Sequence, residues 1–199
     1  MIQSNLIETG RLLLRPFETD DAIAAHAWFG DPLVMQYAPG GPDANLARTR
    51  ERLARYQAHQ ARHGFSKWLV CERSSGQPIG DAGLLIVEGD DLPIAWRADP
   101  SRDEHLARVG ATPPVWIDLG FRFQRSAWRK GYATEVGAAW VSVAFGPLGV
   151  NTLRAFAHPE NLGSLKVLER LGFLDDRRDT VRGMPAVCFA LHRRRLSPI

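Results

Sequence analysis

The sequence contains few cysteines and no long apolar run. Among its 199 residues are two cysteines, Cys71 and Cys188, each inside an apolar segment typical of a strand. Two cysteines in such segments predict buried, reduced thiols and do not indicate a disulfide framework or a paired metal site. No apolar run reaches the ~18 residues needed to span a bilayer, and the N-terminus lacks the features of a secretion signal. We therefore expect a cytoplasmic protein that does not bind a membrane.

Lysine is also scarce, so arginine carries most of the positive charge. Lys67, Lys130 and Lys166 are the only lysines among 25 basic residues, and the net charge is +3. This mild balance suits an anionic ligand, but the basic residues form no stripe and no aromatic platform that would predict a nucleic-acid partner. The six histidines are scattered, and we expect the pair His59 and His63 to be exposed on a very polar helix, so no metal site is predicted.

The order of expected elements indicates an α+β fold in one domain over residues 1–199. Apolar residues make up 45% of the chain and charged residues 24%, which is a globular composition. Such elements build a mostly antiparallel, mixed sheet of about seven strands with about four flanking helices and one parallel crossover. The strands are expected at 11–18, 65–73, 77–88, 115–123, 151–158 and twice within 175–194, and the helices at 20–29, 44–63, 132–145 and 161–173.

Polar caps and apolar spacing define the expected helices more closely. Asp43 is expected to cap the helix 44–63, and Asn161 or Ser164 the helix 161–173. The first helix is expected to turn Ile23, Ala27 and Trp28 toward the core. The apolar face of the helix 44–63 is sparse, and it consists of Leu46, Leu53 and Tyr56. Residues 89–114 have no clean period, and a connection of this length predicts a functional flap or a partly mobile segment.

A basic turn that contains glycine joins the strand 115–123 to the helix 132–145. The first N–H groups of a helix lack internal partners and carry roughly half a positive charge. Arg129 and Lys130 add two cations, and Gly131 lets the backbone approach a ligand. The turn is therefore either an anion site or a tight turn with solvated basic side chains. It has neither the P-loop pattern nor the dinucleotide-binding pattern.

The same turn resembles the acyl-CoA loop of the GNAT superfamily of N-acetyltransferases, [QR]-x-x-G-x-[GA]. The six positions read WRKGYA at 128–133, with Trp128 in place of Gln or Arg. The RimJ/RimL-like branch of ribosomal-protein N-terminal acetyltransferases usually has W-G-K-G-Y-A-T-E, and here Arg129 replaces the glycine. Five further segments match in family order, namely TGRLLLRPFETDDA, GDPLVMQY, QPIGDAGL, IDLGFRF and HPENLGSLKVLERLGF.

The resemblance implies acetyl-CoA as co-substrate, no metal, and a V-shaped splay between the fourth and fifth strands, 116–123 and 152–158. The pantetheine arm would lie in this splay, and Asn161 would touch it. Main-chain groups of Phe121, Arg122 and Phe123 would pair with its amides. Backbone N–H groups would hold the pyrophosphate, and they belong to Arg129, Lys130, Gly131, Tyr132, Ala133 and Thr134.

The resemblance also implies the catalytic groups. Asp118, within IDLGFRF, would be the base that deprotonates the amine; its other interpretation is an exposed carboxylate or an ion-pair partner. Ser164 would lie near the sulfur, and helix capping is the alternative for Ser164 and Asn161. Many family members have a tyrosine that acts as general acid at the position of Leu168. Because leucine cannot donate a proton, Ser164 or water would protonate the thiolate. Tyr132 is expected to pack or to touch the cofactor.

The acceptor is expected to be a primary amine, either a protein N-terminus or a small molecule. The first two helices, the segment 89–114 and the turn at Gly183 should line its pocket. Trp28, Tyr37 and Trp96 would shape the pocket or belong to the core. A cationic acceptor such as a polyamine or an aminoglycoside would be favoured if acidic side chains lined the pocket, namely Asp90, Asp91, Asp99 and Asp103. A non-catalytic CoA-binding or interaction module stays open, as does the choice between monomer and homodimer.

Overall fold

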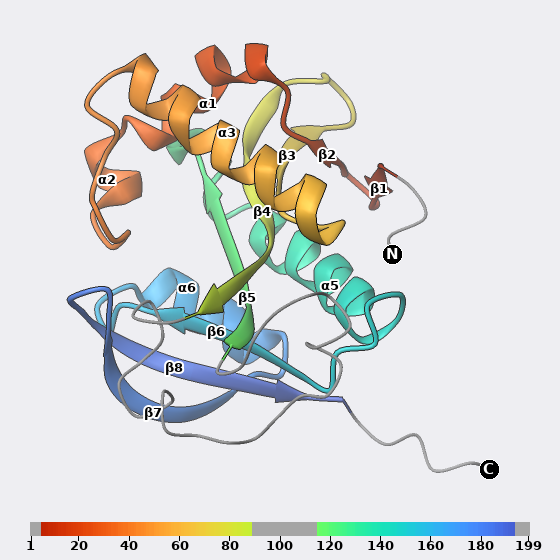
Figure 1. Cartoon of the computed structure of the whole chain (residues 1–199), viewed down its shortest axis with the longest axis vertical. Helices are drawn as coiled ribbons and strands as arrows, with labels where there is room; N and C mark the ends of the chain where they lie inside the picture. Colours follow the sequence, from red (N-terminus) through yellow and green to blue (C-terminus); the bar gives the residue numbers. More distant parts are fainter. Residues whose placement is uncertain (1–4, 89–114, 194–199) are drawn as a thin grey trace. The chain divides into compact units, whose positions relative to one another are not determined.

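The computed structural model describes residues 5–88 and 115–193, and within them lie eight strands and five α-helices (Figure 1). The strands are β1 (Ile7–Glu8), β2 (Leu12–Pro16), β3 (Lys67–Glu72), β4 (Pro78–Glu88), β5 (Val115–Phe123), β6 (Thr152–Ala157), β7 (Leu174–Val181) and β8 (Met184–His192). The α-helices are α1 (Ala22–Phe29), α2 (Pro32–Met35), α3 (Leu46–His63), α5 (Tyr132–Phe145) and α6 (Leu162–Arg170). Two 3-10 turns, η1 (Thr19–Asp21) and η4 (Arg125–Ala127), precede α1 and the loop 128–131, called the basic loop below.

The strands form one mixed sheet in the order β1-β2-β3-β4-β5-β6-β8-β7. The pairs β1–β2, β2–β3, β3–β4, β6–β8 and β7–β8 are antiparallel. β5 pairs in parallel with β6, and the register places Asp118 opposite Arg154. This arrangement confirms the predicted α+β class and the parallel crossover. The two-residue β1 and the four-residue α2 were not predicted, because such short segments carry no readable period.

The chain divides into two compact units. Unit 1 contains Met1–Leu85 and Leu119–Trp140, and unit 2 contains Ile86–Asp118 and Val141–Ile199. The expectation of a single domain over residues 1–199 stays a prediction.

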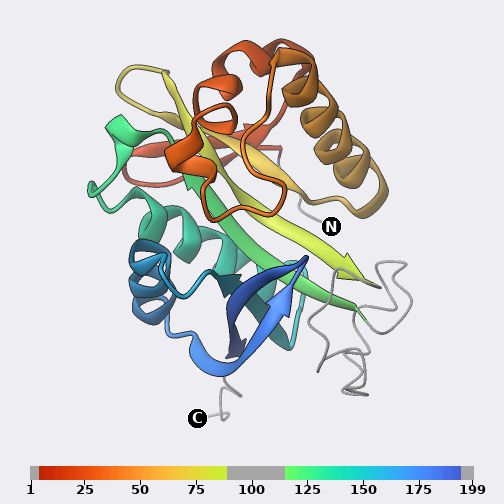
Figure 2. The same ribbon diagram turned by 90° about the vertical axis from the view of Figure 1, so that its left-hand side faces the viewer.

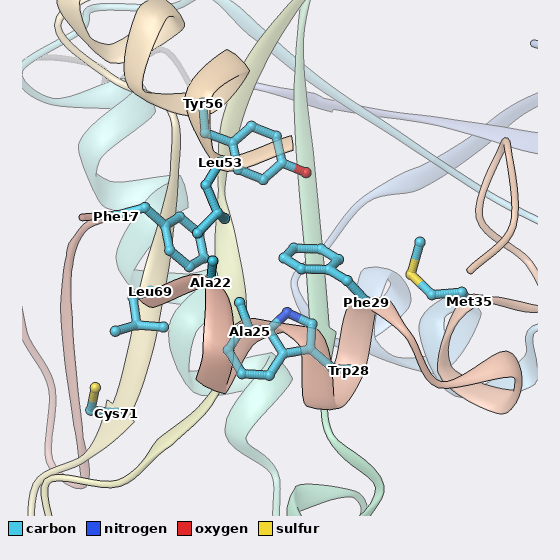
Figure 3. Packing of buried hydrophobic residues seen from close by; sticks show 10 residues of the cluster. All are labelled: Phe17, Ala22, Ala25, Trp28, Phe29, Met35, Leu53, Tyr56, Leu69 and Cys71. Carbon is cyan, nitrogen blue, oxygen red and sulfur yellow. The ribbon is translucent and has the colours of Figure 1, made fainter. Parts of the chain in front are cut away.

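The core of unit 1 lies where α1 and α3 cover one face of the strands (Figure 3). Trp28 of α1 has no exposed surface, and its indole N–H donates to Asp81 Oδ1 at 3.0 Å. The interpretation of Trp28 as a core residue is thereby supported. The cluster consists of Phe17, Ala22, Ala25, Trp28, Phe29, Met35, Leu53, Tyr56, Leu69 and Cys71.

The opposite face of β3 is also buried. Leu69 and Cys71 belong to the cluster under α1 and α3, so the alternation of side chains turns Trp68 to the other face. There Trp68 meets Trp140 of α5 edge to face, with 5.1 Å between the ring centroids. A strand covered on both faces has no polar side, which explains why the apolar run of β3 shows no alternation.

Three expectations about the helices were wrong. In α1, Ile23 is 72% exposed, because the buried positions are 22, 25, 28 and 29, and Ala27 is exposed as well. The cap of α3 is Asn45, whose side chain accepts from the Arg48 N–H at 3.1 Å; Asp43 instead pairs with an arginine of α3. His59 and His63 are not exposed but partly buried beside Phe65.

Unit 2 contains the hairpin of β7 and β8, drawn in blue in Figures 1 and 2, and its ladder with β6. Its core contains Val87, Trp116, Val181, Ala186 and Cys188. Burial raises the pKa of the Cys188 thiol to about 12. Both cysteines of the chain are free and buried, as predicted. No helix in the described ranges has the length and apolar character required to cross a membrane.

Candidate cofactor-binding loop and catalytic residues

In unit 1, Trp128 links the basic loop to the end of β5 by a hydrogen bond. The indole N–H of Trp128 donates to the Phe123 carbonyl at 2.7 Å, and its backbone N–H donates to the Arg125 carbonyl at 3.1 Å. Glutamine and arginine, which the family consensus has at this position, also carry side-chain N–H donors. Although Trp128 differs from the consensus residue, it therefore still provides a side-chain hydrogen-bond donor at the start of the loop.

Two residues of the loop adopt the left-handed conformation. Gly131 has φ 80°, which glycine adopts without a steric penalty, and Arg129 has φ 61°. For a residue with a Cβ this conformation costs about 1–2 kcal/mol. The structure thus explains why a glycine is usual at the position of Arg129 in the resembled branch. The Arg129 side chain is exposed.

The loop ends at the first turn of α5, whose N–H groups are suited to an anion. Glu135 donates its backbone N–H to the Gly131 carbonyl at 3.1 Å, so Gly131 is the cap of the helix. The three preceding N–H groups, of Tyr132, Ala133 and Thr134, therefore have no acceptor within the helix. Together with the helix dipole they form a site for a phosphate or carboxylate group.

Glu72 at the end of β3 binds two side chains of the loop. The Tyr132 hydroxyl donates to Glu72 Oε1 at 2.7 Å, and Lys130 Nζ lies 3.6 Å from the same oxygen. The hydrogen bond from Tyr132, aided by Lys130, lowers the pKa of Glu72, and the same bond raises the pKa of Tyr132. Tyr132 therefore packs in the loop and holds it to β3, which is one of the two roles expected for it.

The main chain of β5 next to the loop alternates between its two edges. Gln124 donates its N–H to the Ile79 carbonyl of β4 at 2.9 Å, and the Arg122 carbonyl lies against Gly80 of the same strand. Alternation then directs the main-chain groups of Phe121 and Phe123 to the opposite edge. Of the three residues predicted to bind pantetheine, these two therefore face away from β4, and the Phe123 carbonyl already accepts the Trp128 indole N–H.

The Arg122 side chain belongs to a buried polar network that the sequence analysis did not anticipate. It donates to Asp81 Oδ2 at 3.1 Å and to the Tyr56 hydroxyl at 2.8 Å, and it lies 5.0 Å from the centroid of the Phe29 ring. Burial lowers the pKa of Arg122, but the pairing with Asp81 outweighs this and raises it above the ordinary value. The only signal in the sequence is the aspartate within the otherwise apolar strand PIGDAGLL.

In unit 2, Asp118 is a buried carboxylate and not an exposed one. Its residue is 8% exposed, and its partner in the parallel register is Arg154. The Arg154 guanidinium lies 5.7 Å from the Trp116 ring centroid and 3.7 Å from Asp176.

Asn161 and Ser164 lie at the start of α6. Asn161 is the N-cap, and its Oδ1 accepts the Ser164 backbone N–H at 3.1 Å. Capping by Asn161 is therefore confirmed, and the Ser164 side chain is partly buried in the first turn. Leu168 is 2% exposed, so hydrocarbon occupies the position that matches the family's tyrosine acid.

The remaining predicted residues are distributed as follows. Tyr37 is partly buried, and Gly183 forms the turn between β7 and β8 with φ 78°. The candidate pocket residues Asp90, Asp91, Trp96, Asp99 and Asp103 lie outside the described residues. Within the described ranges, no group of three or more His, Cys, Asp and Glu side chains could hold a metal ion.

Three residues missed by the sequence analysis contact the loop region, namely Thr9, Arg11 and Glu135. They come from the segments TGRL and YATE, more than a hundred positions apart. Arg11 pairs with Glu135 at 2.6 Å and donates to the Lys130 carbonyl at 3.0 Å. The signal available in the sequence was the family match of both segments, although it did not indicate that they meet.

Comparison with known proteins identifies the family. The family model for the acetyltransferase (GNAT) domain matches residues 11–174 of the sequence, so the chain belongs to this family. It is an acyl-CoA-dependent N-acetyltransferase with acetyl-CoA as co-substrate. A relative, the uncharacterized N-acetyltransferase p20 of Bacillus licheniformis, is 24% identical over 165 residues, 83% of this chain and 80% of the relative.

Two solved structures illustrate the range of proteins with this fold. The ribosomal-protein-S5-alanine acetyltransferase of Vibrio fischeri has a TM-score of 0.69 and 14% identity, with 98% of this chain and 100% of that one covered. The aminoglycoside acetyltransferase AAC(6')-Ib, in complex with ribostamycin and coenzyme A, has a TM-score of 0.71 and 19% identity, with 94% and 99% covered. At sequence identities this low, the similarity shows a shared fold and nothing more specific.

Proposed function

We propose that this N-acetyltransferase binds the diphosphate of acetyl-CoA at the start of α5 and transfers the acetyl group directly to a primary amine in a ternary complex. The observation that carries the proposal is the set of three N–H groups without helical acceptors, Tyr132 to Thr134, which follows the left-handed Gly131. Lys130 and Arg129 supply positive charge at the same place. A micromolar dissociation constant would need about 8 kcal/mol, which several charge-assisted hydrogen bonds and pantetheine burial can supply.

The proposed chemistry uses two side chains of unit 2. Asp118 accepts a proton from the acceptor ammonium, directly or through water, and the neutral nitrogen attacks the thioester carbon. The C–S bond then breaks, the thiolate takes a proton from Ser164 or from water, and the attacking nitrogen returns its remaining extra proton to that group, which leaves a neutral amide and a free thiol. The support for Asp118 is that it is a buried carboxylate on β5, with Arg154 as its register partner on β6.

In unit 1, the main-chain groups of Phe121 and Phe123 are proposed to bind the pantetheine arm. In unit 2, the Asn161 side chain is a further proposed pantetheine contact. Both phenylalanines direct their main-chain groups away from β4. The Phe123 carbonyl already accepts the Trp128 indole N–H, so the N–H and carbonyl of Phe121 and the N–H of Phe123 are the groups proposed for the pantetheine amides. Asn161 uses one oxygen as the cap of α6 and keeps its NH2 group as a donor.

For the acceptor we propose a primary amine on a protein N-terminus or on a small molecule. The two solved structures named above act on these two classes, a ribosomal protein and an aminoglycoside. Both acceptors present an amine that must lose a proton before it attacks, so a single base serves either class.

A release assay for free CoA thiol with a panel of amines tests the function. The panel contains an N-terminal alanine peptide, an aminoglycoside and a polyamine, and calorimetry measures the dissociation constant of CoA separately. Asp118→Asn should lower kcat at least about a hundredfold, since general base catalysis contributes that much, without weakening CoA binding. Asp20→Asn, at an exposed position, is the matched control. Micromolar CoA binding without transfer to any amine would favour a CoA-binding module instead.

A further inference from the structure

We infer that Arg11 is a positioning residue that orients the Lys130–Gly131 peptide toward the diphosphate of the cofactor. The inference rests on the proposed function of the loop. It assigns a role to the segment TGRL, which matches the family but contributes no residue to the proposed chemistry. Thr9, Arg11 and Glu135 are called the Arg11 clasp below.

Arg11 contacts the loop and the first turn of α5 at the same time. Its Nε donates to Glu135 Oε2 at 2.7 Å, and its Nη2 lies 2.6 Å from the same oxygen. Its Nη1 donates to the Lys130 carbonyl at 3.0 Å, and its guanidinium carbon lies 4.7 Å from the centroid of the Tyr132 ring. One planar side chain thus binds the Lys130 carbonyl before Gly131 and the side chains of Tyr132 and Glu135 after it.

Glu135 is itself fixed, so that Arg11 has a rigid partner. The Thr9 hydroxyl and the Arg11 backbone N–H, the latter at 2.9 Å, donate to Glu135 Oε1. Burial raises the pKa of Glu135, but the hydrogen bonds from Thr9 and Arg11 outweigh it and hold the pKa below its ordinary value. The carboxylate also lies in the first turn of α5, where the helix dipole favours a negative charge.

The bond to the Lys130 carbonyl determines the direction of the Gly131 N–H. These two groups belong to one trans peptide, which is planar, so they point in opposite directions. By binding the carbonyl, Arg11 turns the Gly131 N–H away from itself. Among the described residues this N–H has no hydrogen-bond acceptor. It therefore becomes a fourth donor next to the N–H groups of residues 132–134.

The alternative is that Arg11 has a purely structural role and only joins the start of β2 to α5. In that case its loss should lower the free energy of unfolding more than it weakens CoA binding. The Arg11 side chain is 53% exposed, and an ion pair exposed to that degree contributes little to stability. We therefore expect loss of Arg11 to weaken CoA binding much more than it lowers the free energy of unfolding.

Calorimetric titration with CoA tests the clasp in the full chain. Arg11→Ala should weaken CoA binding about tenfold, the effect of losing one hydrogen bond to a charged group. Arg11→Lys should not restore the affinity, because one ammonium lacks the fork that spans Glu135 and the Lys130 carbonyl. Arg48→Ala is the matched control, since Arg48 is an exposed arginine whose ion pair with Glu51 lies within α3.

A double-mutant cycle shows whether Arg11 and Glu135 of the clasp are energetically coupled in CoA binding. If Arg11 acts through Glu135, the double variant Arg11→Ala/Glu135→Ala should bind CoA no more than about twofold more weakly than the weaker single variant. With an acceptor from the amine panel, Arg11→Ala should raise KM for acetyl-CoA and leave kcat unchanged. Additive losses, an equal fall in kcat, full rescue by lysine or unchanged CoA affinity would each overturn the inference. Failure of the unmodified chain to bind CoA would instead remove the proposed function.

Discussion

At the scale of single residues, Arg129 combines a backbone penalty with an exposed positive charge. It adopts φ 61°, while its neighbour in the same loop with positive φ is a glycine. The arginine stands at a position where glycine would remove the penalty. The side chain therefore has a use at this site if the loop binds phosphate, and the two contributions can be separated by substitution.

Arg129→Gly should raise the free energy of unfolding by about 1 kcal/mol, because the left-handed penalty disappears. The same change should weaken CoA binding a few-fold, because one cation near the diphosphate is lost. Urea denaturation and calorimetry measure the two effects. Arg129→Ala is the control: it loses the same charge but keeps the Cβ, so affinity should fall without the gain in stability. A glycine variant with no gain in stability would contradict this account of the backbone.

His59 makes stability depend on pH. Desolvation lowers its pKa to about 4 from the ordinary value of 6.5, and in the folded state its Nδ1 lies 2.7 Å from the Phe65 carbonyl. Between these two values the unfolded chain binds more protons than the folded chain. The contribution is therefore complete above about pH 6.5 and is lost as the pH falls toward 4.

We expect the unfolding free energy to fall by about 1–2 kcal/mol over this range, less than the full shift implies because the ring is partly exposed and solvent screens it. Denaturation series at several pH values measure the slope. His59→Gln should flatten the curve between pH 6.5 and 4, and an unchanged slope in that variant would assign the effect to other groups.

At the scale of elements, the accuracy of the predicted helices and strands followed the strength of their local signals. The ranges expected for β5 and α5 agree with the structure, because a clear apolar alternation ends at a basic turn that contains glycine. The face of α1 was wrong, because several small apolar residues fit more than one stripe. The cap of α3 was wrong because Asp43 pairs with Arg52 and leaves the capping to Asn45.

The approach of β4 to β5 depends on Gly80. A Cβ at this position would lie 2.2 Å from the Arg122 carbonyl oxygen, which belongs to backbone that cannot move aside. Gly80→Ala should therefore destabilise the fold by about 2 kcal/mol or more, the effect of overpacking. Thermal or urea unfolding measures the loss. Gly163→Ala in α6 is the control, since its new Cβ would meet its nearest neighbour at 3.7 Å, and its stability should stay within about 0.5 kcal/mol or increase.

At the scale of the whole molecule, cofactor binding should be visible as added stability. A ligand that binds only the folded chain stabilises it by about 2.7 kcal/mol at one hundred times its dissociation constant. CoA at that concentration should therefore raise the unfolding midpoint. Because the proposed contacts are ionic and partly exposed, the shift should shrink as salt is added at constant CoA. A midpoint that CoA does not move would contradict the proposed binding loop.

The sequence by itself determined the class of fold, the family, and the loop at the start of α5. These features are encoded by local periods, by residues that only a tight turn accepts, and by motifs that occur in family order. The chemistry of the loop also follows from local physics, since the N–H groups of a first helical turn lack acceptors whatever the rest of the chain does.

Only the tertiary structure decided which distant residues meet. The contacts of Arg11 with Glu135 and the Lys130 carbonyl, and of Arg122 with Asp81 and Tyr56, join segments that are far apart in sequence. A polar side chain looks the same in sequence whether it is solvated or buried in a pair, because its partner is chosen by strand order and helix packing. For this reason Asp118 could be named from its motif, whereas its burial and its register with Arg154 could not.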